Sequence, residues 1–217
     1  MRRIQVLGFE MRDWTVRESL HLTGEYLNNG ILNVVYFYSL ETLAAAEHSE
    51  ELQNCLENAD ITIPATPDVL KEAGNAGRGR EQETEKNLYL KGLLRILSRN
   101  RNRVFLIADD PEKVRNLKGS LCSLQPDLDI SGTGILDDPQ NEEGIINEIN
   151  EMIPDVIFVM LSSSAQGRFT ETQRSKINAK LLLAVTEDIL HFSEDGTKKS
   201  TGLFECLRKR LFGDTTE

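Results

Sequence analysis

The sequence has few cysteines and no long apolar run, and each absence excludes a class of protein. The three cysteines, Cys55, Cys122 and Cys206, have neither CxxC spacing nor a nearby histidine, so we expect no disulfide framework and no metal site. No apolar run reaches the roughly 18 residues needed to cross a bilayer. The apolar stretch before Glu10 is shorter than the core of a signal peptide. We therefore expect a cytoplasmic protein.

Basic residues are also scarce: 25 lysines and arginines stand against 35 acidic residues, which gives a net charge of -10. A general nucleic-acid binder needs a basic face to neutralise phosphates, so nucleic acid is excluded as a partner. The glycine-containing words in residues 74–79 do not follow a strand, as a dinucleotide fingerprint must. No cofactor is therefore expected. The 217 residues suffice for one full-sized domain with a substantial core.

Short apolar runs alternate with helical patterns along the chain. Several runs are almost continuously apolar, as parallel strands are when helices cover both of their faces. The expected strands are Ile4–Gly8, Asn33–Ser39, Asp60–Pro64, Val104–Ala108, Leu128–Gly132, Val156–Leu161 and Leu181–Val185.

Amphipathic helices are expected between these runs, over residues 15–28, 40–58, 111–124 and 142–152. The polar stretch 74–86 is expected to be a surface loop or a mobile flap. Strands that alternate with helices require crossover connections and hence a parallel sheet. The sequence predicts an α/β fold with a three-layer, Rossmann-like core over residues 1–195, followed by an appendage over residues 196–217.

Three segments carry specific words in a fixed order. They read LQNCLENADITIP over residues 52–64, RVFLIADDPEKVRNLKGSLCSLQPDLDISGTGI over 103–135, and PDVIFVMLSSSAQGRFTETQRSKINAK over 154–180. In this order and spacing they resemble the WecG/TagA/CpsF family of bacterial glycosyltransferases, with Gln166 and the run Asn178-Ala179-Lys180 among the matches. Because strand-helix alternation recurs in many folds, the words carry the resemblance, not the alternation.

The resemblance implies an enzyme that transfers a sugar, typically N-acetylmannosamine, from a UDP-sugar to a glycan linked to undecaprenyl diphosphate. Such an enzyme serves the synthesis of cell-surface polysaccharide or teichoic acid. The reaction needs a general base for the acceptor hydroxyl, a group that stabilises the leaving diphosphate, and a pocket for uridine. The implied partners are a UDP-sugar and a lipid-linked glycan, and family members often form homo-oligomers.

The residues that correspond to the family's catalytic base and sugar pocket are changed. The family's base, the aspartate of a Pro-Asp-Gly word, corresponds to Ala65, whose methyl group cannot accept a proton. The nearest carboxylate, Asp68, is either a relocated base or an acid that favours the N-terminus of a helix. Tyr36 and Tyr38 replace two polar residues on one strand face. They either hydrogen-bond a ligand or pack in the core.

The expected diphosphate site is changed as well. Ala108 and Asp109 replace a glycine pair, and Asp109 adds negative charge where a diphosphate would bind. Ser163 and Ser164 belong to a serine run at a strand-to-helix junction, which either binds an anion or caps the helix. Residues 184–190 replace a glycine-rich word with bulk and acid. The candidate substrate-binding residues are Gln166, Ser163, Ser164, Tyr36 and Tyr38, and Asp68 is the catalytic candidate.

The segment 198–212 reads KKSTGLFECLRKRLF and carries five basic residues and one acidic residue. Its net charge of +4 leaves -14 for the rest of the chain. A helix here would place Leu203, Phe204, Leu207, Leu211 and Phe212 along one side. Such a helix suits an anionic membrane surface, through Lys198, Lys199, Arg208, Lys209 and Arg210, and implies peripheral attachment to the inner face of the cell membrane. The alternative is packing on its own domain or on another subunit.

Two functions remain open at this point. One is a divergent glycosyltransferase with a degraded active site. The other is a catalytically inactive homologue that acts as a binding or regulatory partner. A third possible function is a Rossmann-like protein that binds another small ligand, but no motif in the sequence supports it.

Overall fold

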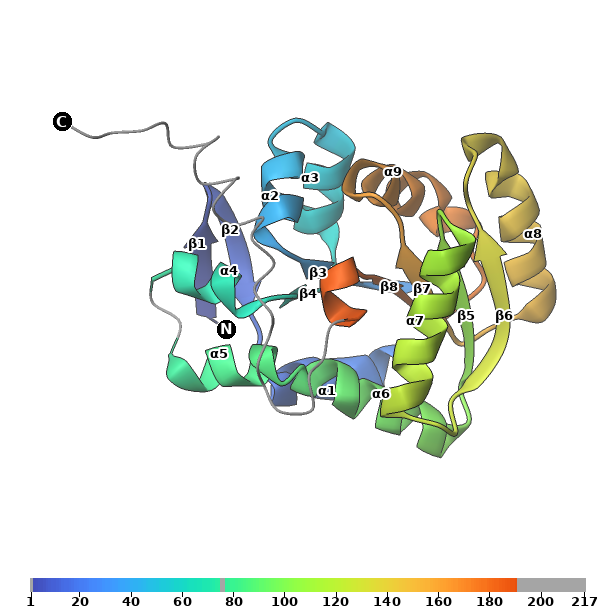
Figure 1. Cartoon of the computed structure of the whole chain (residues 1–217), viewed down its shortest axis with the longest axis horizontal. Helices are drawn as coiled ribbons and strands as arrows, with labels where there is room; N and C mark the ends of the chain where they lie inside the picture. The colour runs from blue at the N-terminus through green and yellow to red at the C-terminus, as the bar shows by residue number, and fades with distance from the viewer. Residues whose placement is uncertain (1, 75–76, 191–217) are drawn as a thin grey trace.

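The computed structural model describes residues 2–74 and 77–190 (Figure 1). The predicted α/β class is confirmed by a parallel sheet of six strands in the order β4-β3-β8-β7-β5-β6, with helices on both faces. The strands are β3 (Asn33–Tyr38), β4 (Ile61–Pro64), β5 (Arg103–Ala108), β6 (Asp129–Ile135), β7 (Val156–Met160) and β8 (Leu181–Ala184).

Two apolar clusters separate the sheet from its helical layers. On one face Tyr36, Ile107 and Ile157 belong to the cluster that includes α2 (Leu40–Ala46), α3 (Glu50–Asn58), α8 (Glu142–Met152) and α9 (Ser163–Gln173). Their neighbours along the strands, such as Leu106 and Phe158, point to the other face. That face is covered by α1 (Val16–Tyr26), α6 (Leu88–Asn100) and α7 (Pro111–Leu124). The central strands are apolar on both sides because both sides are covered.

The helix starts follow the expected capping chemistry. Thr15 forms a capping box with Glu18 at the start of α1, and its hydrogen bonds lower the pKa of the Glu18 carboxyl. Asp110 accepts hydrogen bonds from the backbone N–H groups of Glu112 and Lys113, and Pro111 occupies the first helical position.

The first predicted strand, Ile4–Gly8, does not belong to the parallel sheet. Residues Arg2–Val6 (β1) and Phe9–Asp13 (β2) form a separate antiparallel hairpin, which packs beside β4 through β2. Leu7 and Gly8 make the two-residue turn with φ angles of 48° and 83°. Two positive φ angles are typical of a type I′ turn, whose twist matches that of the strands. Strand β2 was not predicted, because charged residues at alternate positions make its sequence resemble that of a loop.

Two further predictions are corrected. The helix expected over residues 40–58 is divided into α2 and α3, because Ser49 accepts a hydrogen bond from Leu52 N–H and starts a new helix. The stretch expected as a loop contains α5 (Arg78–Glu85), which contacts the short helix α4 (Pro67–Glu72). Helix α6 was not predicted.

Two aspartates hold the amino edge of the sheet, and both belong to the words that carry the family resemblance. Asp60 accepts a hydrogen bond from Val34 N–H at 2.7 Å and pairs with Arg174 at 3.3 Å. Asp155 accepts a hydrogen bond from Arg103 N–H at 2.9 Å and pairs with Lys180 at 2.7 Å. These contacts join neighbouring strands where the apolar core ends.

We expect the substitution Asp155→Asn to lower the free energy of unfolding by about 1 kcal/mol at pH 7, since it removes a charged hydrogen-bond acceptor. Burial opposes ionisation of Asp155, but hydrogen bonds from Lys180 and Arg103 N–H outweigh it and lower its pKa below the ordinary 3.8. A lowered pKa stabilises the fold above pH 3.8, and this contribution disappears as the pH falls through the folded-state value.

Urea unfolding at pH 7 and pH 3 measures the effect. The exposed Asp127→Asn is the matched control. A difference between the wild type and Asp155→Asn that stays constant down to pH 3 would contradict the assignment.

Helices α3 and α9 approach each other closely at Gly167. A Cβ atom there would lie 2.7 Å from Leu52 Cα, a backbone atom that cannot move alone. This packing leaves no room for a side chain at residue 167.

Gly167→Ala is expected to destabilise the protein by about 1–3 kcal/mol through overpacking. Gly144→Ala, in α8 where a Cβ meets nothing within 4 Å, is expected to stabilise it by up to about 1 kcal/mol. Thermal or urea unfolding of the two variants tests the close approach. Equal effects from both substitutions would show that α3 and α9 are farther apart.

Candidate active site

Ligands of parallel α/β sheets bind where the strands end, at the carboxyl edge. Here that edge is formed by Ala65 after β4, Asp109 after β5, residues 161–164 after β7 and residues 185–188 after β8. The structure therefore brings together most of the segments in which the sequence departs from the family's pattern.

Tyr36 and Tyr38 are fully buried in the apolar cluster shared with α3 and α9. The Tyr36 hydroxyl accepts a hydrogen bond from Gln166 Nε2 at 3.3 Å, and Gln166 Oε1 accepts one from Leu161 N–H at 3.1 Å. Gln166 thus links β3 to the end of β7 inside the protein. Burial raises the pKa of both tyrosine hydroxyls above the ordinary value. Both tyrosines therefore remain neutral.

The position of the family's catalytic base is a packed methyl group. Ala65 is 6% exposed and belongs to the apolar cluster on the α6 and α7 face. Its N–H donates to Tyr38 O at 2.8 Å, which continues the pairing of β3 with β4. Asp68 lies in the first turn of α4 and pairs with Lys71 at 3.7 Å on the surface. That is the position of an acid that stabilises a helix N-terminus.

A carboxylate of the chain itself lies at the N-terminus of α9. Asp109 Oδ2 accepts a hydrogen bond from Ser162 N–H at 3.2 Å. Lys113 bridges Asp109 at 3.1 Å and Glu187 at 2.9 Å. The hydrogen bond to Glu187 raises the pKa of Lys113. Burial acts in the opposite direction, and the contact with Asp109 adds to the increase. A helix N-terminus attracts anions, and this one already has one beside it.

The structure does not support the alternative in which a serine side chain of this junction caps α9. Ser162 holds the N-cap position of α9, but its side chain makes no capping hydrogen bond in the structure. Ser163 and Ser164 occupy the first helical positions and are partly or largely exposed. Their hydroxyls remain accessible at the carboxyl edge.

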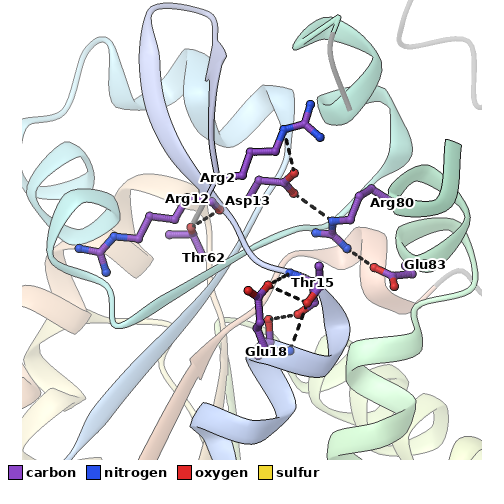
Figure 2. A network of polar contacts seen from close by, with 9 residues as sticks. Arg2, Arg12, Asp13, Thr15, Glu18, Thr62, Arg80 and Glu83 are labelled. Carbon is purple, nitrogen blue, oxygen red and sulfur yellow. Dashed lines mark hydrogen bonds and ion pairs between the residues drawn. The ribbon is translucent and has the colours of Figure 1, made fainter. Parts of the chain in front are cut away.

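A buried ion pair was missed by the sequence analysis. Figure 2 shows Asp13, at the end of β2, facing Arg80 of α5. Arg80 Nε donates a hydrogen bond to Asp13 Oδ1 at 3.0 Å. Arg2 approaches the same carboxylate at 3.9 Å, and Arg80 also pairs with Glu83. Thr62 Oγ1 donates a hydrogen bond to Arg12 O at 3.4 Å, so the pair lies beside β4 (Figure 2). No sequence signal was available, because Arg80 stood in an expected loop.

Among residues 2–74 and 77–190, no group of three or more His, Cys, Asp or Glu side chains could hold a metal ion. In the same part of the chain, no helix is long and apolar enough to cross a membrane. The candidate membrane contacts Lys198, Lys199, Arg208, Lys209 and Arg210 lie outside the described residues.

The parallel sheet, covered by helices on both faces, defines the chain as a Rossmann-like α/β protein. Residues 4–197 match the model of the glycosyl transferase WecG/TagA/CpsF family. The chain therefore belongs to this family, as its words predicted. A search of curated proteins gave no match.

The two tyrosines provide a matched test of the packing. The Tyr38 hydroxyl is buried with no hydrogen-bond partner among the described residues. Tyr38→Phe is therefore expected to leave stability unchanged or to raise it by up to about 1 kcal/mol. Tyr36→Phe is expected to lower it by about 1 kcal/mol, since Gln166 loses its partner. Urea unfolding measures both. A loss of stability in Tyr38→Phe larger than in Tyr36→Phe would contradict this assignment.

Proposed function

We propose that this chain is a divergent WecG/TagA/CpsF protein whose degraded active site no longer transfers sugar, and that it acts as a binding or regulatory partner. The observation that carries the proposal is the Asp109 carboxylate at the N-terminus of α9, held by Ser162 N–H and Lys113. It stands where the family resemblance puts the donor's diphosphate.

Electrostatics decides against a diphosphate beside Asp109. Two like unit charges 4 Å apart repel by about 4 kcal/mol at the effective dielectric constant of a protein surface. The hydroxyls of Ser163 and Ser164 could each return about 0.5–1.5 kcal/mol as hydrogen bonds. Repulsion therefore outweighs the hydrogen bonds that remain for the ligand. Lys113 cannot compensate freely, since it is shared by Asp109 and Glu187.

Loss of the base supports the same conclusion. A positioned general base contributes about 10²–10⁴-fold to the rate of such a reaction. The methyl group of Ala65 supplies none of it, and Asp68 is paired with Lys71. The space beside β3 is filled by Tyr36 and Tyr38, which belong to the core.

One observation favours the second candidate, a transferase that still uses UDP-N-acetylmannosamine and an undecaprenyl-diphosphate-linked acceptor. Gln166 is retained, and the hydroxyls of Ser163 and Ser164 remain accessible beside it. In that case Asp68 would act as the base and the serines would contact the donor.

Titration of UDP and UDP-N-acetylmannosamine against the full chain separates the two functions. Isothermal calorimetry and melting temperature are expected to show no response at millimolar ligand. A ligand with a dissociation constant of 10 μM would, at 1 mM, stabilise the fold by about 2.7 kcal/mol and raise the melting temperature by roughly 5–10 °C. Such a response in the wild type, together with release of UDP on adding acceptor, would establish a working transferase.

Asp109→Asn sharpens this test, because it keeps the side-chain shape and removes the charge. It is expected to strengthen UDP binding at least about tenfold, so that millimolar UDP gives a response in this variant and none in the wild type. Glu187→Gln is the matched control: it removes a charge from Lys113 but not from the α9 N-terminus. An equal gain in both variants would assign the effect to net charge alone.

A further inference from the structure

A pocket of about 450 Å³ opens between the β1–β2 hairpin and α3. Its apolar lining comes from Leu7, Phe9, Met11, Leu56 and Ala59. Leu56 and Ala59 stand at the end of α3, just before β4 begins. The pocket therefore lies toward the amino end of β4, away from the carboxyl edge and independent of the proposed function.

Leu7 is unusual at the mouth of this pocket. It adopts a φ of 48°, in the left-handed region that type I′ turns reserve for Asn, Asp or Gly. Residues with such backbone strain cluster at active sites, ligand-binding sites and switch regions. Leu7 and Phe9 are only partly buried against the core cluster. The strained turn thus keeps apolar surface at the rim of an open pocket.

The charged side chains around the pocket indicate what kind of segment it could bind. Three acidic side chains, Glu10, Glu47 and Glu57, line the pocket, against the single arginine Arg12. Glu10 is paired with Arg3 and Glu57 accepts a hydrogen bond from Gln53, whereas Glu47 is exposed at the end of α2. A segment that is apolar on one side and basic on the other fits both the floor and the rim.

The sequence of residues 198–212 has this pattern: its net charge is +4, and a helical spacing would bring Leu203, Phe204 and Leu207 to one side. The described chain ends at Leu190, so eight residue steps lead to Lys198. They span at most roughly 26–29 Å. Strand β4 lies two strands from β8, roughly 10 Å away across the sheet. Leu190 packs on the α6 and α7 face, whereas the pocket residues Leu7 and Leu56 belong to the cluster on the other face. The tether must therefore also pass the edge of the sheet, for which its length beyond the lateral distance of roughly 10 Å is left.

We infer that residues 198–212 dock in the pocket between the hairpin and α3, with their apolar side against Leu7, Phe9 and Leu56 and their basic side facing Glu47. Tethering supplies an effective concentration in the millimolar range, so a weak intrinsic affinity is sufficient. Docking holds this segment away from the carboxyl edge of the sheet.

Hydrogen exchange of the full chain, followed by mass spectrometry, tests the docking. Backbone amides in residues 203–212 are expected to exchange at least about tenfold more slowly than in a synthetic peptide of residues 198–212. Leu7→Asn suits the type I′ turn and removes the apolar side chain. It is expected to restore fast exchange in residues 203–212 without loss of stability. Glu47→Lys is expected to do so through charge.

Ile31→Asn and Glu148→Lys are matched controls, because each changes an exposed residue of the same kind outside the pocket. They are expected to leave exchange unchanged. The proposal is overturned if the wild-type segment exchanges as fast as the peptide, or if Leu7→Asn and Glu47→Lys leave its protection intact. Protection that requires phosphatidylglycerol vesicles would identify a membrane contact instead. Protection that rises with protein concentration would identify a second copy of the chain.

Discussion

The central strands of this protein are covered on both faces, and that constraint determines where its polar chemistry lies. Strands β3, β7 and β8 hydrogen-bond to parallel neighbours, and their side chains enter one of two apolar clusters. A polar side chain within the strands therefore has only core groups as partners. The Tyr36 hydroxyl bonds Gln166, whereas the Tyr38 hydroxyl has no partner among the described residues. Asp60, Asp155 and Asp109 lie at the edges of the sheet, where each has partners.

The two edges differ in how closely their residues follow the words on which the family resemblance was based. At the amino edge, Asp60, Asp155 and Lys180 keep the words of the family, and each bonds a neighbouring strand or helix. At the carboxyl edge the words have changed, but the replacements have partners inside the chain. Asp109 bonds Ser162 N–H and Lys113, for example. The family resemblance is therefore carried mainly by residues that hold the sheet together. Such residues keep their structural role whether or not the chain transfers sugar.

The fold was predictable from the sequence to the extent that it depends on local patterns. Apolar runs located the strands of the sheet, and amphipathic patterns located α1 and α7, which begin directly after the capping residues Thr15 and Asp110. The hairpin was misplaced because β2 is charged at alternate positions, and one serine divided a helix that looked continuous. The site was less accessible. Tyr36 and Gln166 are 130 positions apart, and Asp109 and Ser162 are 53 apart, so no spacing in the sequence reveals that they touch.

The Asp109 contact also links the stability of the fold to the proposed loss of sugar transfer. An open phosphate site keeps backbone N–H groups at a helix N-terminus without a partner until the ligand arrives. Here the carboxylate of Asp109 satisfies the Ser162 N–H permanently and draws Lys113 into the same contact. The group that would exclude a diphosphate thus strengthens the junction of β5, α7 and α9. Recovering a ligand site at this edge would then require giving up a contact that stabilises the fold, a common conflict between stability and activity.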